Sequence, residues 1–152
     1  MNEEKTKYVE VLFVMLSTGN NRPHQRLWKD VAGFCTHLSR FTKCHLYALR
    51  GYEKGKNSHE HLIILVPSDE LDRFNSRFPS FQSWKAWSWI HEVSPFKPEL
   101  KESAYTYTLV KHEPVLDGDS DTFFCPKYYT RCRRGACSHK VTINWQQQLE
   151  LF

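Results

Sequence analysis

The sequence lacks an apolar run long enough to cross a membrane. Its longest apolar stretch, residues 9–16, is interrupted by Glu10, whereas a membrane-spanning helix needs about 20 predominantly apolar residues. The first residues, Met-Asn-Glu-Glu-Lys, carry acids where a secretory signal carries bases ahead of an apolar stretch. We therefore expect an intracellular protein that does not associate with membranes.

Other absences exclude further classes of protein. There is no internal repeat and no low-complexity linker, which argues against a solenoid or a disordered chain. No Walker A motif is present, so we expect no helicase domain within this sequence, which is either a stand-alone protein or part of a longer one. The five cysteines are an odd number without paired CxxC spacing, which favours free thiols or a metal clip over a disulfide framework.

What the sequence contains is typical of one globular domain. Its 152 residues are 40% hydrophobic and 25% charged, enough for a single core. Aromatic residues make up 14% of the chain, and there are eight histidines. The net charge of +4 is compatible with a nucleic-acid partner, especially if aromatic side chains are exposed to stack on bases.

The hydrophobic pattern predicts the element order β-α-β-β-α-β-α. Residues 8–16 are apolar on both faces of an extended chain, which is typical of a central strand. Strands are also predicted over residues 43–53, 59–67 and 84–93, the first two as an antiparallel hairpin, and helices over about residues 23–41, 68–78 and 98–112. We therefore expect an α+β fold: an antiparallel sheet of about five strands with helices packed on it.

The segment His59-Glu60-His61 begins the strand predicted over residues 59–67. Side chains two residues apart in a strand project from the same side, so the two imidazoles are placed to share one metal ion. Glu53 ends the preceding strand across the hairpin and can complete a set of two histidines and one carboxylate, with open positions for water or substrate. The alternative is a pair of surface histidines beside a turn.

Tyr107 and Lys111 lie four residues apart in the helix predicted over residues 98–112, and therefore on one helical face. A tyrosine can act as a covalent nucleophile when a cation holds its target, and a nearby lysine can stabilise the developing charge. Leu100 and Ala104 extend this face, which predicts that it is packed. The alternative is that Tyr107 lies at the edge of the core and Lys111 extends past it to solvent.

In their order along the chain, these segments resemble the HUH endonucleases, in particular the nuclease domains of rolling-circle replication initiators (Rep proteins). FVMLST (13–18) resembles the first motif of the family, GYE (51–53) followed by HEH (59–61) resembles its metal-binding set, and YTLVK (107–111) resembles its nucleophile motif. The resemblance covers residues 8–112 and implies an RRM-like nuclease fold. It also implies Glu53, His59 and His61 as metal ligands, Tyr107 as the nucleophile and Lys111 as its helper.

Two departures from the family pattern bear on this assignment. The middle residue of the HxH motif is usually bulky and apolar, but here it is Glu60, which we expect to point away from the metal. Many viral Rep proteins have YxxK, whereas this chain has YxxxK, with Thr108 where YxxK would need its tyrosine. Tyr105 is the alternative nucleophile, and it is expected to face elsewhere because it lies about 200° around the helix from Tyr107.

The resemblance implies metal-dependent nicking and joining of single-stranded DNA through a 5′-phosphotyrosine, as in the initiation of rolling-circle replication. The implied cofactor is Mn²⁺ or Mg²⁺, of which two imidazole ligands favour Mn²⁺. The implied partners are a single-stranded DNA origin or hairpin and a host or separate helicase. The implied location is the cytoplasm of a bacterial host, or the nucleus of a eukaryotic host if the protein is viral.

Two groups of side chains are predicted to hold the DNA strand on the sheet face that carries the histidines. Aromatic candidates on or beside the strand over residues 84–93 are Trp84, Trp87 and Trp89, and the alternative is that Trp87 and Trp89 belong to the core. Basic candidates for phosphate contact are Arg50 and Lys54, which flank the predicted metal carboxylate.

The chain is predicted to divide near residue 114. Residues 1–114 form the nuclease core, and residues 115–152 form a basic extension packed on or continuing the same domain. The extension contains four residues that can hold a structural zinc ion: Cys125, Cys132, Cys137 and His139. Their spacing, C-x6-C-x4-C-x-H, is not that of a standard zinc finger, and the alternative is a set of free thiols.

Two other functions remain open from the sequence. A single-tyrosine HUH transposase shares the HxH motif and one tyrosine, and would work as a dimer on transposon-end hairpins. A non-catalytic RRM-like module shares the element order and binds single-stranded nucleic acid without cutting it. It gives no reason for the predicted ligands and Tyr107 to occur together, and the sequence has no aromatic RNP-like run.

Overall fold

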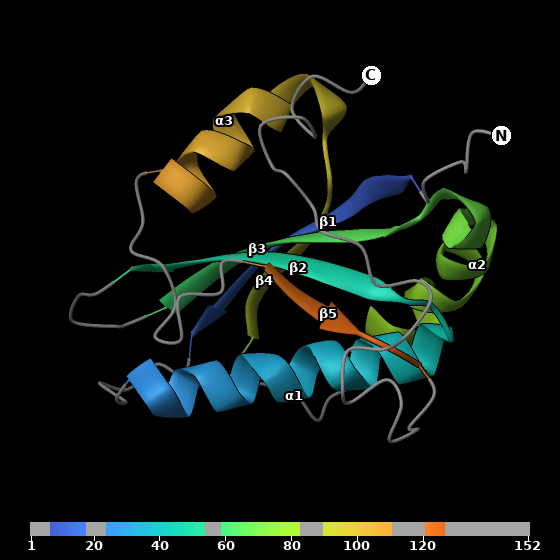
Figure 1. Cartoon of the computed structure of the whole chain (residues 1–152), viewed down its shortest axis with the longest axis horizontal. Coiled ribbons are helices and arrows are strands. Elements are labelled where there is room, and N and C mark those ends of the chain that lie inside the picture. The colour runs from blue at the N-terminus through green and yellow to red at the C-terminus, as the bar shows by residue number, and fades with distance from the viewer. Residues whose placement is uncertain (1–6, 18–23, 54–58, 83–89, 111–120, 127–152) are drawn as a thin grey trace, which may run out of the picture.

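The computed structural model describes the main chain of residues 7–17, 24–53, 59–82, 90–110 and 121–126. Within these ranges the chain forms a five-stranded antiparallel sheet with three helices packed against it (Figure 1). The predicted α+β fold is therefore confirmed. In the described part of the chain, no helix is both long and apolar enough to cross a membrane.

The sheet has the spatial order β4-β1-β3-β2-β5. Its strands are β1 (Tyr8–Ser17), β2 (Leu46–Glu53), β3 (His59–Pro67), β4 (Ile90–Pro95) and β5 (Asp121–Phe124). The helices are α1 (His24–Thr42), α2 (Leu71–Gln82) and α3 (Lys101–Tyr105). Short turns of other helix types adjoin them: the 3₁₀ turns η1 (Ser68–Glu70) and η3 (Pro98–Leu100), and the π-helix η4 (Thr106–Val110).

The main differences from the expected elements concern α2, β4 and the last strand. α2 runs past Phe78 although Pro79 favours a helix end there, because one further turn buries Phe81 against Phe34 of α1 (ring centroids 5.7 Å apart). β4 extends to Pro95, with residues 83–89 outside the described ranges. A sheet of about five strands was expected, but the position of the fifth was not, because four residues are too few for a clear alternation. β5 pairs with β2, so the sheet continues beyond residue 114.

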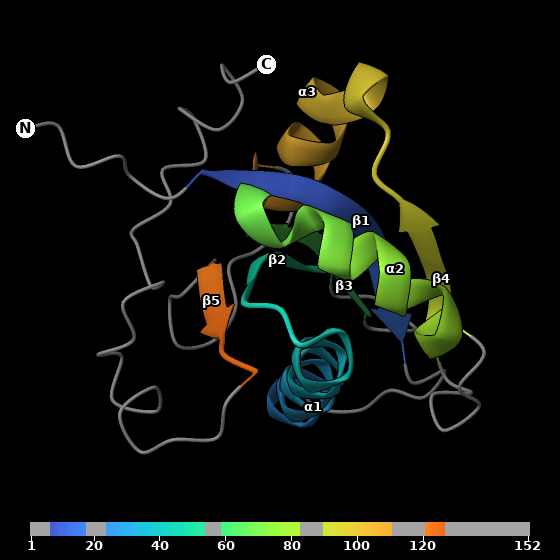
Figure 2. The ribbon, with the colours of Figure 1, turned by 90° about the vertical axis from the view of Figure 1, so that its right-hand side faces the viewer.

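The two faces of the sheet are covered by different helices. α1 and α2 pack on one face and α3 on the other (Figure 1, Figure 2). The buried core on the α1 face contains Leu12, Val14, Val31, Phe34, Cys35, Leu38, Cys44, Leu46, Ala48, Leu62, Ile64, Val66, Phe74, Phe78 and Phe81. The smaller core on the α3 face contains Tyr8, Tyr47, Leu49, Ile63, Leu65 and Tyr105.

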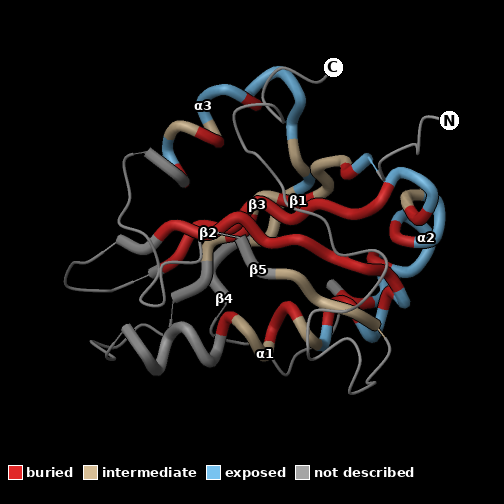
Figure 3. Tube along the Cα trace, viewed as in Figure 1, coloured by how far each residue is buried: buried red, intermediate tan, exposed pale blue. Residues whose placement is uncertain are grey.

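β3 is the middle strand of the sheet and is apolar on both faces. It pairs with β1 on one side and with β2 on the other. Residues 62–65 have no exposed surface, and most of β3 is buried in Figure 3. A strand that is covered on both faces needs a continuous apolar run, which is why Leu-Ile-Ile-Leu-Val occupies this place.

Candidate active site

The predicted metal ligands occupy one end of the β2–β3 hairpin. In the antiparallel register Glu53 pairs with His59, and Gly51 pairs with His61. Directly paired residues project to the same face, as do residues two apart on one strand. The register therefore gives positions 53, 59 and 61 one common face of the sheet, as expected. The side chains of Glu53 and His59 lie outside the described part, and the described side chains contain no group of three potential metal ligands.

The side chain of His61 is buried between two aromatic rings. Its ring centroid lies 4.8 Å from that of Tyr107 in an edge-to-face arrangement and 5.9 Å from that of Phe13 on β1. Only 5% of the surface of His61 is exposed. Edge-to-face packing is a favourable geometry for aromatic pairs. The structure thus brings a predicted metal ligand and the predicted nucleophile into contact, although they come from different motifs of the sequence.

Tyr107 lies in η4, the π-helix that continues α3. A π-helix bonds residue i to residue i+5 and occurs frequently at functional sites. Tyr107 is 41% exposed, whereas Tyr105 and Thr108 are fully buried. Tyr107 is therefore the tyrosine of this segment that a substrate can reach. Lys111, its predicted helper, lies outside the described residues.

An open groove of about 330 Å³ runs beside Tyr107, between α3 and the sheet at β1 and β4. Its lining is largely apolar, with Lys97 as the basic member: Phe13, Ser94, Pro95, Phe96, Lys97, Leu100, Ser103, Ala104 and Tyr107. The expectation that the helical face with Leu100, Ala104 and Tyr107 is packed holds only in part: Ala104 packs against the core on the α3 face, and Tyr107 contacts His61. Leu100 is instead 51% exposed and borders this groove. The buried contact of α3 with the sheet is made by Tyr105.

A bulge in β1 explains how α3 is attached to the sheet. The register of β1 with β3 shifts between Glu10 and Leu12, and an extra residue in one strand changes the face to which the following side chains point. Glu10 therefore lies on the α3 face. There its Oε1 accepts a hydrogen bond from the hydroxyl of Tyr105 (2.8 Å) and pairs with Nζ of Lys101 (3.1 Å).

This Glu10 cluster (Glu10, Lys101 and Tyr105) holds the helix that carries Tyr107. Burial, followed by the nearby Glu10 carboxylate, raises the pKa of Tyr105 well above its ordinary value. A buried phenol that stays protonated is not placed to attack a phosphate, so the alternative nucleophile at Tyr105 does not fit the structure. Sequence reasoning missed Glu10 and Lys101, because a bulge leaves no signal in the alternation of β1.

Replacing Glu10 by alanine is expected to destabilise the fold by about 2–4 kcal/mol, since it removes the carboxylate that the buried ammonium of Lys101 and the phenol of Tyr105 contact. Urea unfolding followed by circular dichroism measures the loss. Glu102→Ala is the matched control, because this glutamate is exposed on the same helix. Equal stability of the two variants would contradict the role of the Glu10 cluster.

The stability of the protein is expected to fall as the pH rises above about 10, the ordinary pKa of tyrosine. The pKa of Tyr105 is raised in the folded state, so the folded protein keeps the phenol protonated at a pH where the unfolded chain loses the proton. The stabilisation by Tyr105 is therefore complete below about pH 10. Above it, the free energy of unfolding falls by up to about 1.4 kcal/mol per pH unit. Burial also raises the pKa of Cys35 to about 12, with the same sign. The comparison is therefore between wild type and Tyr105→Phe, by urea unfolding at pH 8 and pH 11. Parallel losses would contradict this prediction.

Arg50 does not serve the function predicted for it. It is fully buried on the α1 face, where its Nε and Nη2 donate to Oε1 and Oε2 of Glu60 at 2.9 and 3.0 Å. The expected contact between Arg50 and a DNA phosphate is therefore wrong, because alternation along β2 places Arg50 on the covered face, with Ala48. The expectation that Glu60 points away from the two histidine positions agrees with this pairing.

The remaining predicted residues are not brought into this site by the described structure. Cys125 is partly buried and lies next to β5. The following residues lie outside the described part of the chain: Lys54, Trp84, Trp87, Trp89, Cys132, Cys137 and His139. Their roles in DNA and zinc binding remain predictions from the sequence.

Comparison with known proteins adds no family assignment to this geometry. The chain matches no protein-family model, no curated protein and no solved structure.

Proposed function

We propose that this chain nicks and rejoins single-stranded DNA with the help of a divalent cation, through a 5′-phosphotyrosine at Tyr107, as at the start of rolling-circle replication. The observation that carries the proposal is the contact between His61 and Tyr107, whose ring centroids are 4.8 Å apart. It occurs on the sheet face shared by positions 53, 59 and 61. If Tyr107 were only a residue at the edge of the core, and the histidines only a surface pair, the contact between Tyr107 and His61 would have no explanation.

The residues present fit a divalent cation. Glu53, His59 and His61 would hold it, because one carboxylate and two imidazoles are a donor set that suits Mn²⁺ and leaves positions for phosphate oxygen and water. When bound, the cation would polarise the scissile phosphate and neutralise charge in the transition state.

The covalent step belongs to Tyr107. Its phenolic oxygen loses its proton and forms a bond to phosphorus while the bond from phosphorus to the 3′-oxygen breaks; that oxygen leaves with the bonding electrons and takes up a proton. The phosphodiester becomes a phosphotyrosine, so a later 3′-hydroxyl can reverse the step and rejoin the strand. The exposure of Tyr107, at 41%, meets the requirement that an extended strand can approach it.

The groove beside Tyr107 suits one nucleotide next to the scissile phosphate. Phe13, Phe96 and Leu100 supply an apolar lining for an unpaired base, and Lys97 supplies a cation for its phosphate. This groove replaces Arg50 as the expected binding surface near the site.

The proposal is tested by incubating the protein with a pool of single-stranded oligonucleotides labelled at the 3′ end, with Mn²⁺ or with EDTA. We expect a protein–DNA adduct that survives denaturation in Mn²⁺ and is absent in EDTA, with the modification mapped to Tyr107 by peptide mass spectrometry. An adduct on another residue would reject the assignment. Binding without any adduct would favour the non-catalytic RRM-like alternative.

A further inference from the structure

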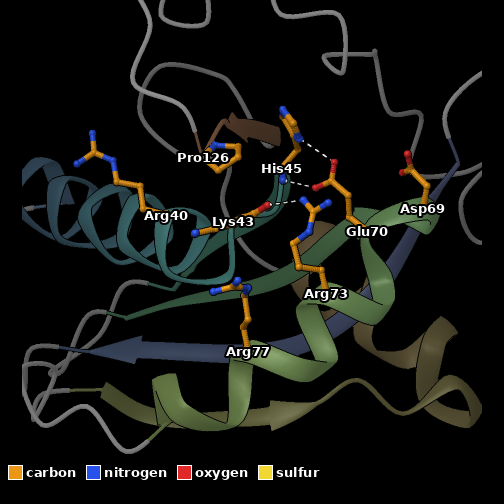
Figure 4. A pocket seen from close by; sticks show the side chains of 8 residues that line it. All are labelled: Arg40, Lys43, His45, Asp69, Glu70, Arg73, Arg77 and Pro126. Atoms are coloured by element: carbon orange, nitrogen blue, oxygen red, sulfur yellow. Dashed lines mark hydrogen bonds and ion pairs between the residues drawn. The ribbon is translucent and has the colours of Figure 1, made fainter.

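A basic pocket of about 670 Å³ lies away from the candidate active site, where α1 ends and α2 begins (Figure 4). Arg40 and Lys43 enter its lining from the end of α1, and Arg73 and Arg77 from α2. His45, also in the lining, directly precedes β2, whereas Glu53 ends that strand. At about 3.3 Å per residue the two positions are roughly 25 Å apart.

One of the two carboxylates that line this basic pocket is held by hydrogen bonds within the fold. Glu70 is buried, and its two oxygens bond to His45: Oε1 accepts from the main-chain N–H at 2.7 Å, and Oε2 lies 2.8 Å from Nδ1. The other acid, Asp69, is exposed. Among the described side chains that line the pocket, four cationic groups therefore outnumber the two carboxylates, and the lining carries a net positive charge.

Lys43 has a backbone conformation that is unfavourable for a residue with a Cβ, so its positive charge is retained at a position where glycine would be more stable. The Cys44 N–H bonds to the Ser39 carbonyl at 3.1 Å, which closes α1, and Lys43 has φ 57. Glycine is the usual residue at this left-handed position, because a Cβ is unfavourable there. Arg73 Nη1 donates to the Lys43 carbonyl at 2.8 Å, which fixes its guanidinium beside the lysine.

The two arginines of α2 add a second cost. Arg73 and Arg77 are four residues apart on one helix, and like charges at this spacing repel each other. Stabilisation of the α1 dipole accounts for cations in the last turn of that helix, such as Arg40. Interaction with the α1 dipole does not explain Arg77, which lies one turn after Arg73 on α2 and lines the same basic pocket.

We propose that this basic pocket binds an anion with two or more adjoining phosphate groups. Guanidinium groups bind phosphate oxygens in pairs, and an ammonium group adds a point charge. The volume falls within the usual range for ligand pockets, about 300–1,000 Å³, and is large enough for a triphosphate or for two nucleotides of a strand. The inference does not rest on the proposed nicking activity, because the two sites share no residue.

The test is a pair of titrations of the full chain at low salt in EDTA, with sodium tripolyphosphate by calorimetry and with a fluorescent 12-residue oligothymidylate by anisotropy. Lys43→Gly and Arg77→Ala are each expected to weaken binding about two- to fivefold, the range for an exposed ion pair, and the double variant about four- to twentyfold. Lys7→Ala is the matched control, since Lys7 is exposed and does not line the pocket. Lys43→Gly should fold at least as well as wild type, so weaker binding would not reflect unfolding.

The two ligands distinguish the source of the phosphates. Weaker binding of tripolyphosphate alone assigns the pocket to a free oligophosphate, such as that of a nucleotide. Weaker binding of the oligonucleotide, with or without the other, assigns it to phosphates of a nucleic-acid strand. The proposal is overturned if neither ligand binds wild type, or if the pocket variants bind both ligands as tightly as Lys7→Ala does. Because no divalent cation is present, these outcomes are independent of the nicking assay.

Discussion

Tyr107→Phe is expected to abolish the protein–DNA adduct while leaving the stability of the protein nearly unchanged. The phenylalanine ring keeps the edge-to-face contact with His61 but lacks the oxygen that attacks phosphorus. Loss of a covalent nucleophile lowers the rate of such reactions by on the order of 10³-fold or more. The measurement is the amount of denaturation-resistant adduct formed in Mn²⁺ over time, together with a urea unfolding curve of the same preparation.

Tyr105→Phe is the matched control for this prediction, because it removes the same hydroxyl from the same helical segment. Tyr105 is buried and donates to Glu10, so this variant should lose about 1–3 kcal/mol of stability and still form the adduct at low temperature. A Tyr107→Phe protein that forms adduct at the wild-type rate would refute the assignment of the nucleophile. Adduct loss confined to Tyr105→Phe would refute it as well.

Glu60→Ala is expected to lower the free energy of unfolding by about 3–5 kcal/mol, the usual cost of removing one partner of a buried ion pair. Both side chains of the pair are fully buried, and their two hydrogen bonds are 2.9 and 3.0 Å long. Removal of the carboxylate leaves the Arg50 guanidinium in the core between the sheet and α1. Urea unfolding by circular dichroism, with tryptophan fluorescence as a second probe, measures the change.

The double variant Arg50→Met/Glu60→Leu separates the cost of an unpaired charge from the cost of lost packing. Apolar residues of similar volume often replace a buried pair without loss of stability, so the double variant should recover most of what Glu60→Ala loses. A loss below about 1 kcal/mol in Glu60→Ala would contradict the burial of this pair.

The Arg50–Glu60 pair also accounts for the acidic residue in the middle of the HEH segment. Glu60 and its partner Arg50 are buried together on the same covered face. The pair lies at the hairpin end where Glu53 is opposite His59. We infer that it supports the main chain beneath the proposed ligands, from the face that a substrate does not reach.

Much of the fold follows from residue patterns that act over short distances. The continuous apolar run in residues 62–66 requires cover on both faces, and β3 is the middle strand. Alternation on β2 and β3 also predicts which positions of the HEH segment share a face, and the register of the hairpin agrees. These predictions succeed because the period of a strand is set by its own backbone.

The sequence by itself therefore determined the α+β class, the β2–β3 hairpin and the common face of positions 53, 59 and 61. Only the tertiary structure decided that Tyr107 contacts His61. The bulge in β1 turns Glu10 to the α3 face, and the Glu10 cluster holds α3 on that face, opposite α1. The tertiary structure likewise places Arg50 in the core as the partner of Glu60 rather than at a DNA contact. It also brings Arg40 of α1, Lys43 just after α1, and two arginines of α2 into one pocket. Each of these features brings together residues that are far apart in the chain. Their positions are determined by how helices and strands pack on one another, and the side-chain periodicity of a single element does not contain that information.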